Sequence, residues 1–149
     1  MQVVTLLNAL LTPLLAIITT TILVCQYKLA NQRWRLDLYD KRYPVFDAVR
    51  EYLMCIGQQA GIDLGQLINF HRDCSDKEFL FGKEIQEYLR DLYSKGVDLH
   101  CMKDRLQKLP QGDDRIKLCE ENSKLLLWFG DQYEVSKKLF SKYLCIDKK

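Results

Sequence analysis

The sequence predicts an all-α protein with one N-terminal transmembrane helix followed by a small cytosolic antiparallel helical bundle. Residues 3–25 contain no charged side chain, and the first one in the chain is Lys28. Further on, apolar residues recur at intervals of three and four, the period of an amphipathic helix, and no stretch alternates as a strand would. We therefore expect a membrane anchor over residues 1–27 and a cytosolic helical domain over residues 28–149.

Residues 3–25 are long enough to cross a bilayer, because a helix of this length spans roughly 35 Å against a hydrocarbon core of about 30 Å. Asn8, Pro13 and several threonines lower its hydrophobicity, but none imposes the cost of a charge in lipid. The segment lacks a basic leading region and a small-x-small cleavage site, so we interpret it as a retained anchor rather than a signal peptide.

Basic residues gather on the C-terminal side of this span, and they predict its orientation. Positive charge beside a span stays in the cytoplasm, so we expect the N-terminus outside and the domain inside. Trp34 lies between two arginines at the level of the lipid headgroups, where aromatic residues anchor spans. The predicted interfacial anchor consists of Lys28, Arg33, Trp34 and Arg35. A cytosolic domain keeps its six cysteines reduced, and their irregular spacing favours free thiols.

The segment from Trp34 to Leu53 is predicted as an amphipathic helix. Its apolar residues recur every three or four positions, at Leu36, Tyr39, Tyr43, Phe46, Val49 and Leu53. Pro44 removes one helical hydrogen bond and disfavours helical geometry at the preceding residue, so we expect a kink or break at Tyr43. The helix is therefore either continuous with the membrane span or bent away from it.

Glycine, proline and aspartate mark the later elements. Three glycines between residues 57 and 65 indicate a looser stretch, with a short helix over residues 63–71, and Asp76 is typical of a helix start. A long helix is predicted from Lys83 to Leu109. Its apolar face carries Ile85, Leu89, Leu92, Leu99, Met102 and Leu106.

Residues 109–114, with the sequence LPQGDD, contain the clearest turn signal in the chain. A last helix is predicted over residues 114–145. Its apolar positions are Ile116, Leu126, Phe129, Tyr133, Phe140 and Tyr143. Three long helices and one short helix, joined by this turn and a looser linker, suit an antiparallel bundle.

Small and polar residues share one face of the predicted span. On a helical wheel Thr5, Asn8, Thr12, Ala16 and Thr19 fall within about a third of the circumference. Such residues let helices approach closely, and an asparagine hydrogen-bonds across an interface, so we expect self-association or pairing with another span. The alternative is that the threonine hydroxyls bind carbonyl groups of their own helix and mediate no association.

Three large apolar residues in succession, Phe79 to Phe81, exceed what a solvated helix start tolerates. We expect Phe79 and Phe81, or at least one of them, to be buried against the last helix, with Gly82 giving room for close backbone approach or for a local turn. An exposed ring there would instead indicate a partner-binding surface.

Candidate chemistry is sparse. His71 with Cys74, and His100 with Cys101, offer four zinc ligands in principle, but zinc sites favour other spacings, so we interpret these as ordinary helix residues. We expect no catalytic residue, no metal and no cofactor. The net charge of +2 combines 22 basic with 20 acidic side chains, which is too balanced to indicate a nucleic-acid partner.

Three stretches resemble small uncharacterised bacterial membrane-anchored proteins that have an RLDLYDKRY-type juxtamembrane helix and an FLFG element. The stretches are RWRLDLYDKRYPVFDAVREYL (33–53), FLFGKEIQEYLRDLY (79–93) and LLLWFGDQYEVSKKLFSKYL (125–144). The resemblance implies a bacterial inner-membrane protein and assigns no activity.

Two hypotheses about function follow. The first is a non-enzymatic, single-pass interaction or regulatory module that binds the lipid bilayer and a protein partner or its own copies. The alternative is an oligomeric membrane effector, of the toxin or phage-defence type, that perturbs the membrane on a cytosolic signal.

Overall fold

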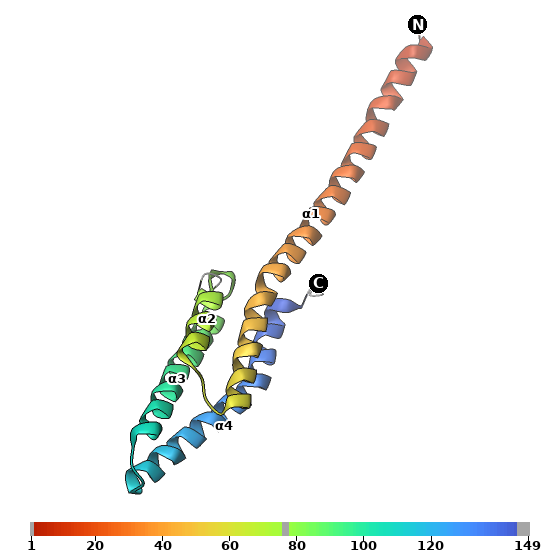
Figure 1. The fold of residues 1–149 in the computed structure, drawn as a ribbon. Coiled ribbons are helices and arrows are strands. Elements are labelled where there is room, and N and C mark those ends of the chain that lie inside the picture. The colour runs from red at the N-terminus through yellow and green to blue at the C-terminus, as the bar shows by residue number, and fades with distance from the viewer. Residues whose placement is uncertain (1, 76–77, 146–149) are drawn as a thin grey trace. The chain divides into compact units, whose positions relative to one another are not determined.

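The computed structural model describes residues 2–75 and 78–145, while the side chains of residues 2–10, Thr12 and Glu78 lie outside this description. These residues form four α-helices and one short 3-10 helix, with no strand among them (Figure 1). The elements are α1 (Gln2–Gln59), α2 (Leu64–Ser75), η1 (Glu78–Leu80), α3 (Lys83–Lys108) and α4 (Asp113–Leu144). The predicted all-α class is therefore confirmed.

The chain divides into two compact units, Met1–Asp37 and Leu38–Lys149. Within the first, α1 contains a stretch that is long and apolar enough to cross a membrane, and none of that stretch is buried against other parts of the chain. Side chains such as Ile17 and Leu23 are about two-thirds exposed, at 65% and 63%. This much of the predicted anchor agrees with the structure.

Pro44 does not interrupt α1, so of the expected kink or break at Tyr43 the break is wrong, and the kink stays a prediction. Pro44 and Asp40 are both exposed residues, and the proline cannot donate the helical hydrogen bond that the Asp40 carbonyl group would accept. One proline inside a helix costs about 3 kcal/mol. The next turns contain Val45 and Val49, both fully buried, and burying each valine stabilises by about 1.5–3 kcal/mol. Packing therefore offsets the cost of the proline.

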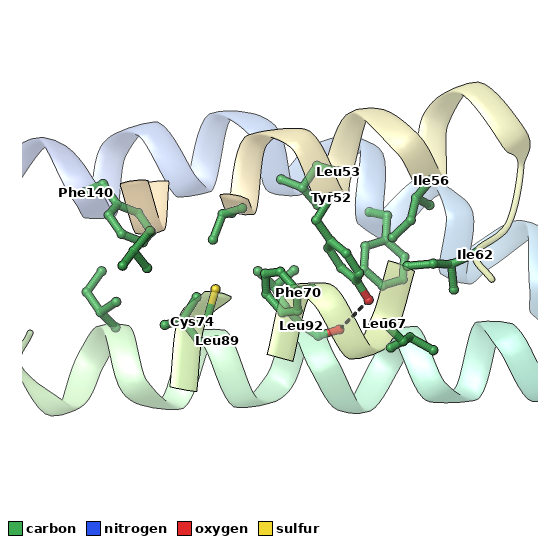
Figure 2. Packing of buried hydrophobic residues seen from close by; sticks show 14 of the residues in the cluster. Tyr52, Leu53, Ile56, Ile62, Leu67, Phe70, Cys74, Leu89, Leu92 and Phe140 are labelled. Carbon is green, nitrogen blue, oxygen red and sulfur yellow. Dashed lines mark hydrogen bonds between the residues drawn. The ribbon is translucent and has the colours of Figure 1, made fainter. Parts of the chain in front are cut away.

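The core of the second unit draws apolar side chains from all four helices (Figure 2). Tyr52 of α1 lies at its centre, stacked on Phe70 of α2 with ring centroids 4.1 Å apart and edge-on to Phe129 of α4 at 6.3 Å. Aromatic rings of this size bring distant helices into contact without close approach of their backbones. The fully buried side chains include Val45, Val49, Ile56, Ile62, Ile85, Leu92, Leu99 and Phe140.

Gly96 lets α3 approach the Tyr52 side chain. A Cβ atom at position 96 would lie 1.8 Å from the Tyr52 hydroxyl oxygen and 3.1 Å from Leu67 Cδ2. That hydroxyl donates a hydrogen bond of 3.4 Å to the Leu92 carbonyl oxygen on the same helix (Figure 2). The absence of a side chain at Gly96 therefore decides where Tyr52 sits.

The turn predicted from LPQGDD joins α3 to α4. The Leu109 backbone ends α3, Gly112 precedes α4, and Arg115 donates a hydrogen bond of 2.8 Å to the Leu109 carbonyl oxygen across the turn. Both long helices agree with their predicted bounds to within a residue. The short helix α2 continues four residues beyond the predicted end at residue 71, and the predicted helix start at Asp76 lies outside the described residues.

Some positions predicted on apolar faces are solvent-exposed, and for these the prediction is wrong. They are Leu36, Tyr43, Ile116 and Tyr133. In α1 the predicted positions Val49 and Leu53 are buried, and Val45, Tyr52 and Ile56, which were not predicted, are buried beside them. A spacing of three to four residues is shared by neighbouring faces of one helix, and only the packing partners select between them.

Candidate functional site

The FLFG element, residues 79–82, separates two phenylalanines by one residue and places them in opposite environments. The Phe79 side chain is 81% exposed, whereas Phe81 is only 6% exposed. The Phe81 ring packs edge-on against two rings of α4, Phe140 at 5.4 Å and Tyr143 at 5.5 Å. The predicted burial against the last helix is thus confirmed for Phe81. The alternative prediction, that Phe81 belongs to a partner-binding surface, does not hold for this residue, because its ring is enclosed.

Gly82 gives the predicted room for close approach. A Cβ atom there would lie 2.6 Å from the Tyr143 hydroxyl oxygen. The backbone of Gly82 is extended, with φ of −71°, so its requirement is for space rather than for an unusual conformation. Any side chain at this position would push Tyr143 away from the Phe81 ring.

Arg42 of α1 ties the FLFG element to the end of α4. Its Nε donates a hydrogen bond of 3.0 Å to the Leu80 carbonyl oxygen, and its Nη1 donates one of 3.3 Å to the Tyr143 carbonyl oxygen. The guanidinium carbon lies 5.8 Å from the Phe81 ring centre and 5.4 Å from that of Tyr143. We call this arrangement the Arg42 fork.

The chemistry of the fork suits arginine. The Tyr143 carbonyl belongs to the last turn of α4, where carbonyl groups lack helical partners and a cation is favourable. A planar guanidinium bonds two acceptors while stacking on aromatic faces, which an ammonium cannot do. Sequence reasoning missed this role, because the two acceptors are backbone atoms 38 and 101 residues away and leave no side-chain signal.

The predicted interfacial residues all lie on the described part of α1. Lys28, Arg33 and Arg35 are exposed, and Trp34 is 64% exposed. Their position at a membrane surface stays a prediction.

The predicted association face of the span is only partly described. Ala16 and Thr19 are exposed on α1, whereas the side chains of Thr5, Asn8 and Thr12 lie outside the description. The Thr19 hydroxyl is 2.9 Å from the Leu15 carbonyl oxygen and 3.0 Å from that of Ala16. The alternative interpretation, in which threonine hydroxyls bind carbonyl groups of their own helix, predicts this arrangement. The Thr19 hydroxyl therefore donates its hydrogen bond within α1.

Thr20 and Thr21 behave in the same way. Their hydroxyls donate to the Ala16 and Ile17 carbonyl oxygens at 2.7 and 2.8 Å. An uncompensated hydroxyl in hydrocarbon is costly, and these bonds remove that cost without a partner helix. The hydroxyls of the three threonines therefore have hydrogen-bond acceptors within α1 itself.

The two histidines have packing roles. The His71 ring lies 4.8 Å from the Tyr93 ring, and His100 Nδ1 is 3.0 Å from the Ile62 carbonyl oxygen. Cys74 is buried and Cys101 is exposed. Over residues 2–75 and 78–145, no group of three His, Cys, Asp or Glu side chains comes together to hold a metal ion.

Two phenols, the buried Tyr52 and the partly buried Tyr88, have raised pKa values. Burial raises the pKa of Tyr52 well above its ordinary value, with smaller contributions from Tyr93 and Cys74. Burial likewise raises the pKa of Tyr88, whose hydroxyl donates a hydrogen bond of 3.3 Å to the Gln132 carbonyl oxygen. Both effects follow from removing a phenolate from water, and both phenols serve the core.

No family model, no curated protein and no solved structure matches this chain. Function therefore has to be inferred from the chemistry of its own residues. The described features that stand out are an exposed aromatic ring on the braced FLFG element and a cluster of exposed cations on α1.

Proposed function

We propose that this chain is a single-pass, membrane-anchored helical interaction module without enzymatic activity. Residues 1–27 would hold it in a bacterial inner membrane with the N-terminus outside. Residues 28–149 would form a cytoplasmic antiparallel bundle that engages a protein partner or a second copy. The apolar stretch of α1 and the basic residues that follow it support this placement.

The exposed ring of Phe79 is the observation that carries the proposal. A ring that is 81% exposed costs free energy in water, and burying it in a partner's pocket would recover that energy. Aromatic side chains of this kind dominate the binding energy of many interfaces.

The residues that follow Phe79 are held in place, which favours a binding role for its exposed ring. The Arg42 fork fixes the Leu80 carbonyl group, and the Phe81 ring is locked against α4. The backbone on the C-terminal side of Phe79 is therefore braced before a partner arrives, which lowers the entropy cost of association. A partner with an apolar pocket that accepts one aromatic ring fits this surface.

Site-specific photocrosslinking in native membranes tests the proposal. A photoreactive phenylalanine analogue at position 79 should give a discrete adduct. The matched control places the same analogue at position 127, where Leu127 of α4 is 72% exposed. An adduct at twice the 17.6 kDa chain mass indicates a second copy, and another mass indicates a different protein. If position 79 gives no more adduct than position 127, the interaction surface is in the wrong place.

The alternative, an oligomeric membrane effector, has weaker support. It requires polar faces from several copies to meet in the membrane. The hydroxyls of Thr19, Thr20 and Thr21 instead bond within α1, which favours an anchor. Expression with a membrane-potential dye distinguishes the two, since only the effector would depolarise cells.

A further inference from the structure

A cavity of about 290 Å³ lies between α1 and α2, within the second unit of the chain. On α1 it extends from Ala48 to Cys55, so its length along that helix is roughly 10 Å. Pockets that bury drug-sized molecules have volumes of about 300–1,000 Å³. This cavity therefore suits a smaller molecule.

The floor of the cavity is apolar. It consists of the buried rings of Tyr52 and Phe70, which stack on one another, and of Ala48, which packs against the same core. The Tyr52 hydroxyl donates its hydrogen bond to the Leu92 carbonyl oxygen (Figure 2), so Tyr52 contributes ring surface to the cavity rather than a hydrogen-bond donor. An occupant that matches this floor has an apolar part.

The rim of the cavity carries more acid than base. Two acidic side chains, Glu51 and Asp73, and one basic side chain, Arg72, give the lining a net charge of −1. Arg72 Nε lies 3.4 Å from a carboxylate oxygen of Asp73, so these two charges are paired. Within the part of the chain that the structure describes, Glu51 forms no ion pair. The excess negative charge of the rim therefore lies at Glu51.

Two amide side chains of α2 complete the rim. The Gln66 side-chain oxygen accepts a hydrogen bond of 3.1 Å from the Asp63 backbone N–H, so this group already serves the start of α2. Asn69 follows one turn later and is exposed, and its amide oxygen is an acceptor for an N–H donor. Glu51 and Asn69 together thus favour an occupant that carries N–H donors.

We propose that this cavity binds a short alkylammonium ion, with its ammonium group at the Glu51 carboxylate and its alkyl chain on the apolar floor. A single positive charge balances the net charge of the lining, and hydrogen bonds between two charged groups are the stronger kind. The alkyl chain loses contact with water as it covers the floor, which is favourable. The proposal depends neither on the membrane placement nor on the Phe79 ring.

An anion suits the cavity poorly, although Arg72 belongs to the rim. It would compete with Asp73 for the guanidinium group and would bring a second negative charge toward Glu51, and like charges repel. A neutral molecule would leave the Glu51 carboxylate unpaired. Charge complementarity therefore favours a cation as the occupant.

Alkylation of Cys55, which lines the cavity, measures its occupancy. The full chain in detergent micelles is treated with iodoacetamide, and each cysteine is quantified by peptide mass spectrometry. Butylammonium chloride should slow the alkylation of Cys55 in a saturable manner, and it should leave that of Cys101, an exposed thiol on α3, unchanged. Butanol, butyrate and ammonium chloride, which lack either the charge or the alkyl chain, should give no protection at the same concentration.

Charge variants at the rim test the assignment of Glu51. Glu51→Gln should weaken butylammonium binding and Arg72→Gln should tighten it, each by roughly two- to fivefold, because both charges are exposed to solvent. The matched controls are Glu87→Gln and Arg105→Gln, which make the same changes at exposed residues of α3 outside the cavity. They should leave the affinity unchanged.

Alkylation of Cys74 in the same samples reports folding, because this thiol is buried in the folded chain and reacts once the chain unfolds. A folded wild-type chain in which butylammonium gives no saturable protection of Cys55 would overturn the proposal. Equal protection by butanol or by butyrate would also overturn it, since the cationic group would then be irrelevant. Equal affinities of the Glu51→Gln and Glu87→Gln variants would exclude Glu51 as the partner of the ammonium group.

Discussion

Replacing Gly96 with alanine should destabilise the protein, although alanine is the better helix former. Gly96 is buried within α3, and the added Cβ would lie 1.8 Å from the Tyr52 hydroxyl oxygen. No real structure tolerates that distance, so the Tyr52 ring would have to move. Its stack on Phe70 and its hydrogen bond to the Leu92 carbonyl oxygen would both be disturbed.

The expected change in the free energy of unfolding combines one stabilising and several destabilising contributions. Alanine gains about 1 kcal/mol of helix propensity over glycine. Overpacking costs about 1–3 kcal/mol, and loss of the aromatic stack and of the hydrogen bond costs about 0.5–1.5 kcal/mol each. Gly96→Ala should therefore lower the free energy of unfolding by about 1–5 kcal/mol.

The Tyr52 hydroxyl is the group that the new Cβ atom at position 96 would clash with. A variant that also removes this hydroxyl therefore tests the explanation. In the double variant with Tyr52→Phe, the closest remaining atoms are the ring carbon Cζ and Leu67 Cδ2, both at 3.1 Å. A small shift relieves contacts of this length. The double variant should therefore be more stable than Gly96→Ala alone, by at least about 1 kcal/mol.

Urea unfolding of the full chain in detergent micelles, followed by near-ultraviolet circular dichroism, measures these differences. Gly130→Ala in α4 is the control, because its new Cβ would meet nothing within 4 Å and should stabilise by about 1 kcal/mol. If Gly96→Ala stabilises as much as Gly130→Ala, or if Tyr52→Phe gives no rescue, the close contact does not govern the packing.

Four further predictions concern the core, the Arg42 fork, alkaline pH and topology. Phe81→Ala should cost about 3–5 kcal/mol in urea unfolding, whereas Phe79→Ala should stay within about 0.5 kcal/mol; similar losses for both would contradict their different burial. Arg42→Lys should cost about 1–2 kcal/mol, since an ammonium lacks the planar fork that bonds the two carbonyl groups and stacks on the Phe81 and Tyr143 rings. Hydrogen exchange should accelerate at residues 78–86, and unchanged exchange there would contradict the bracing role. The pKa of Tyr52 is raised by burial, so the stability it contributes is complete below the ordinary tyrosine pKa of about 10 and is lost as pH rises above it. Tyr52→Phe should therefore reduce the fall in the free energy of unfolding at alkaline pH. An unaltered fall would exclude this phenol as its source. A reporter that works only in the cytoplasm, fused after Lys149, should be active. Activity of a reporter that works only in the periplasm, fused at the same position, would contradict the proposed orientation.

The sequence by itself determined the fold class and the limits of α3 and α4. Apolar periodicity predicted helices, and LPQGDD placed the turn between α3 and α4 to within a residue, because proline, glycine and aspartate act through local backbone geometry. The apolar stretch of α1 is likewise a local property, since it needs only a run of uncharged residues. The pairing of Gly82 with a close approach was also predictable from one residue.

Only the tertiary structure decided which neighbouring positions are buried. Phe79 and Phe81 are chemically identical, yet α4 offers rings to one and not to the other. Pro44 breaks a local rule, and the burial of Val45 and Val49 overrides it. The sequence alone does not distinguish Arg42 from the other basic residues that follow the span. Its hydrogen-bond partners are backbone carbonyl groups far along the chain. Backbone acceptors carry no residue identity, so no pattern of side chains could have revealed them.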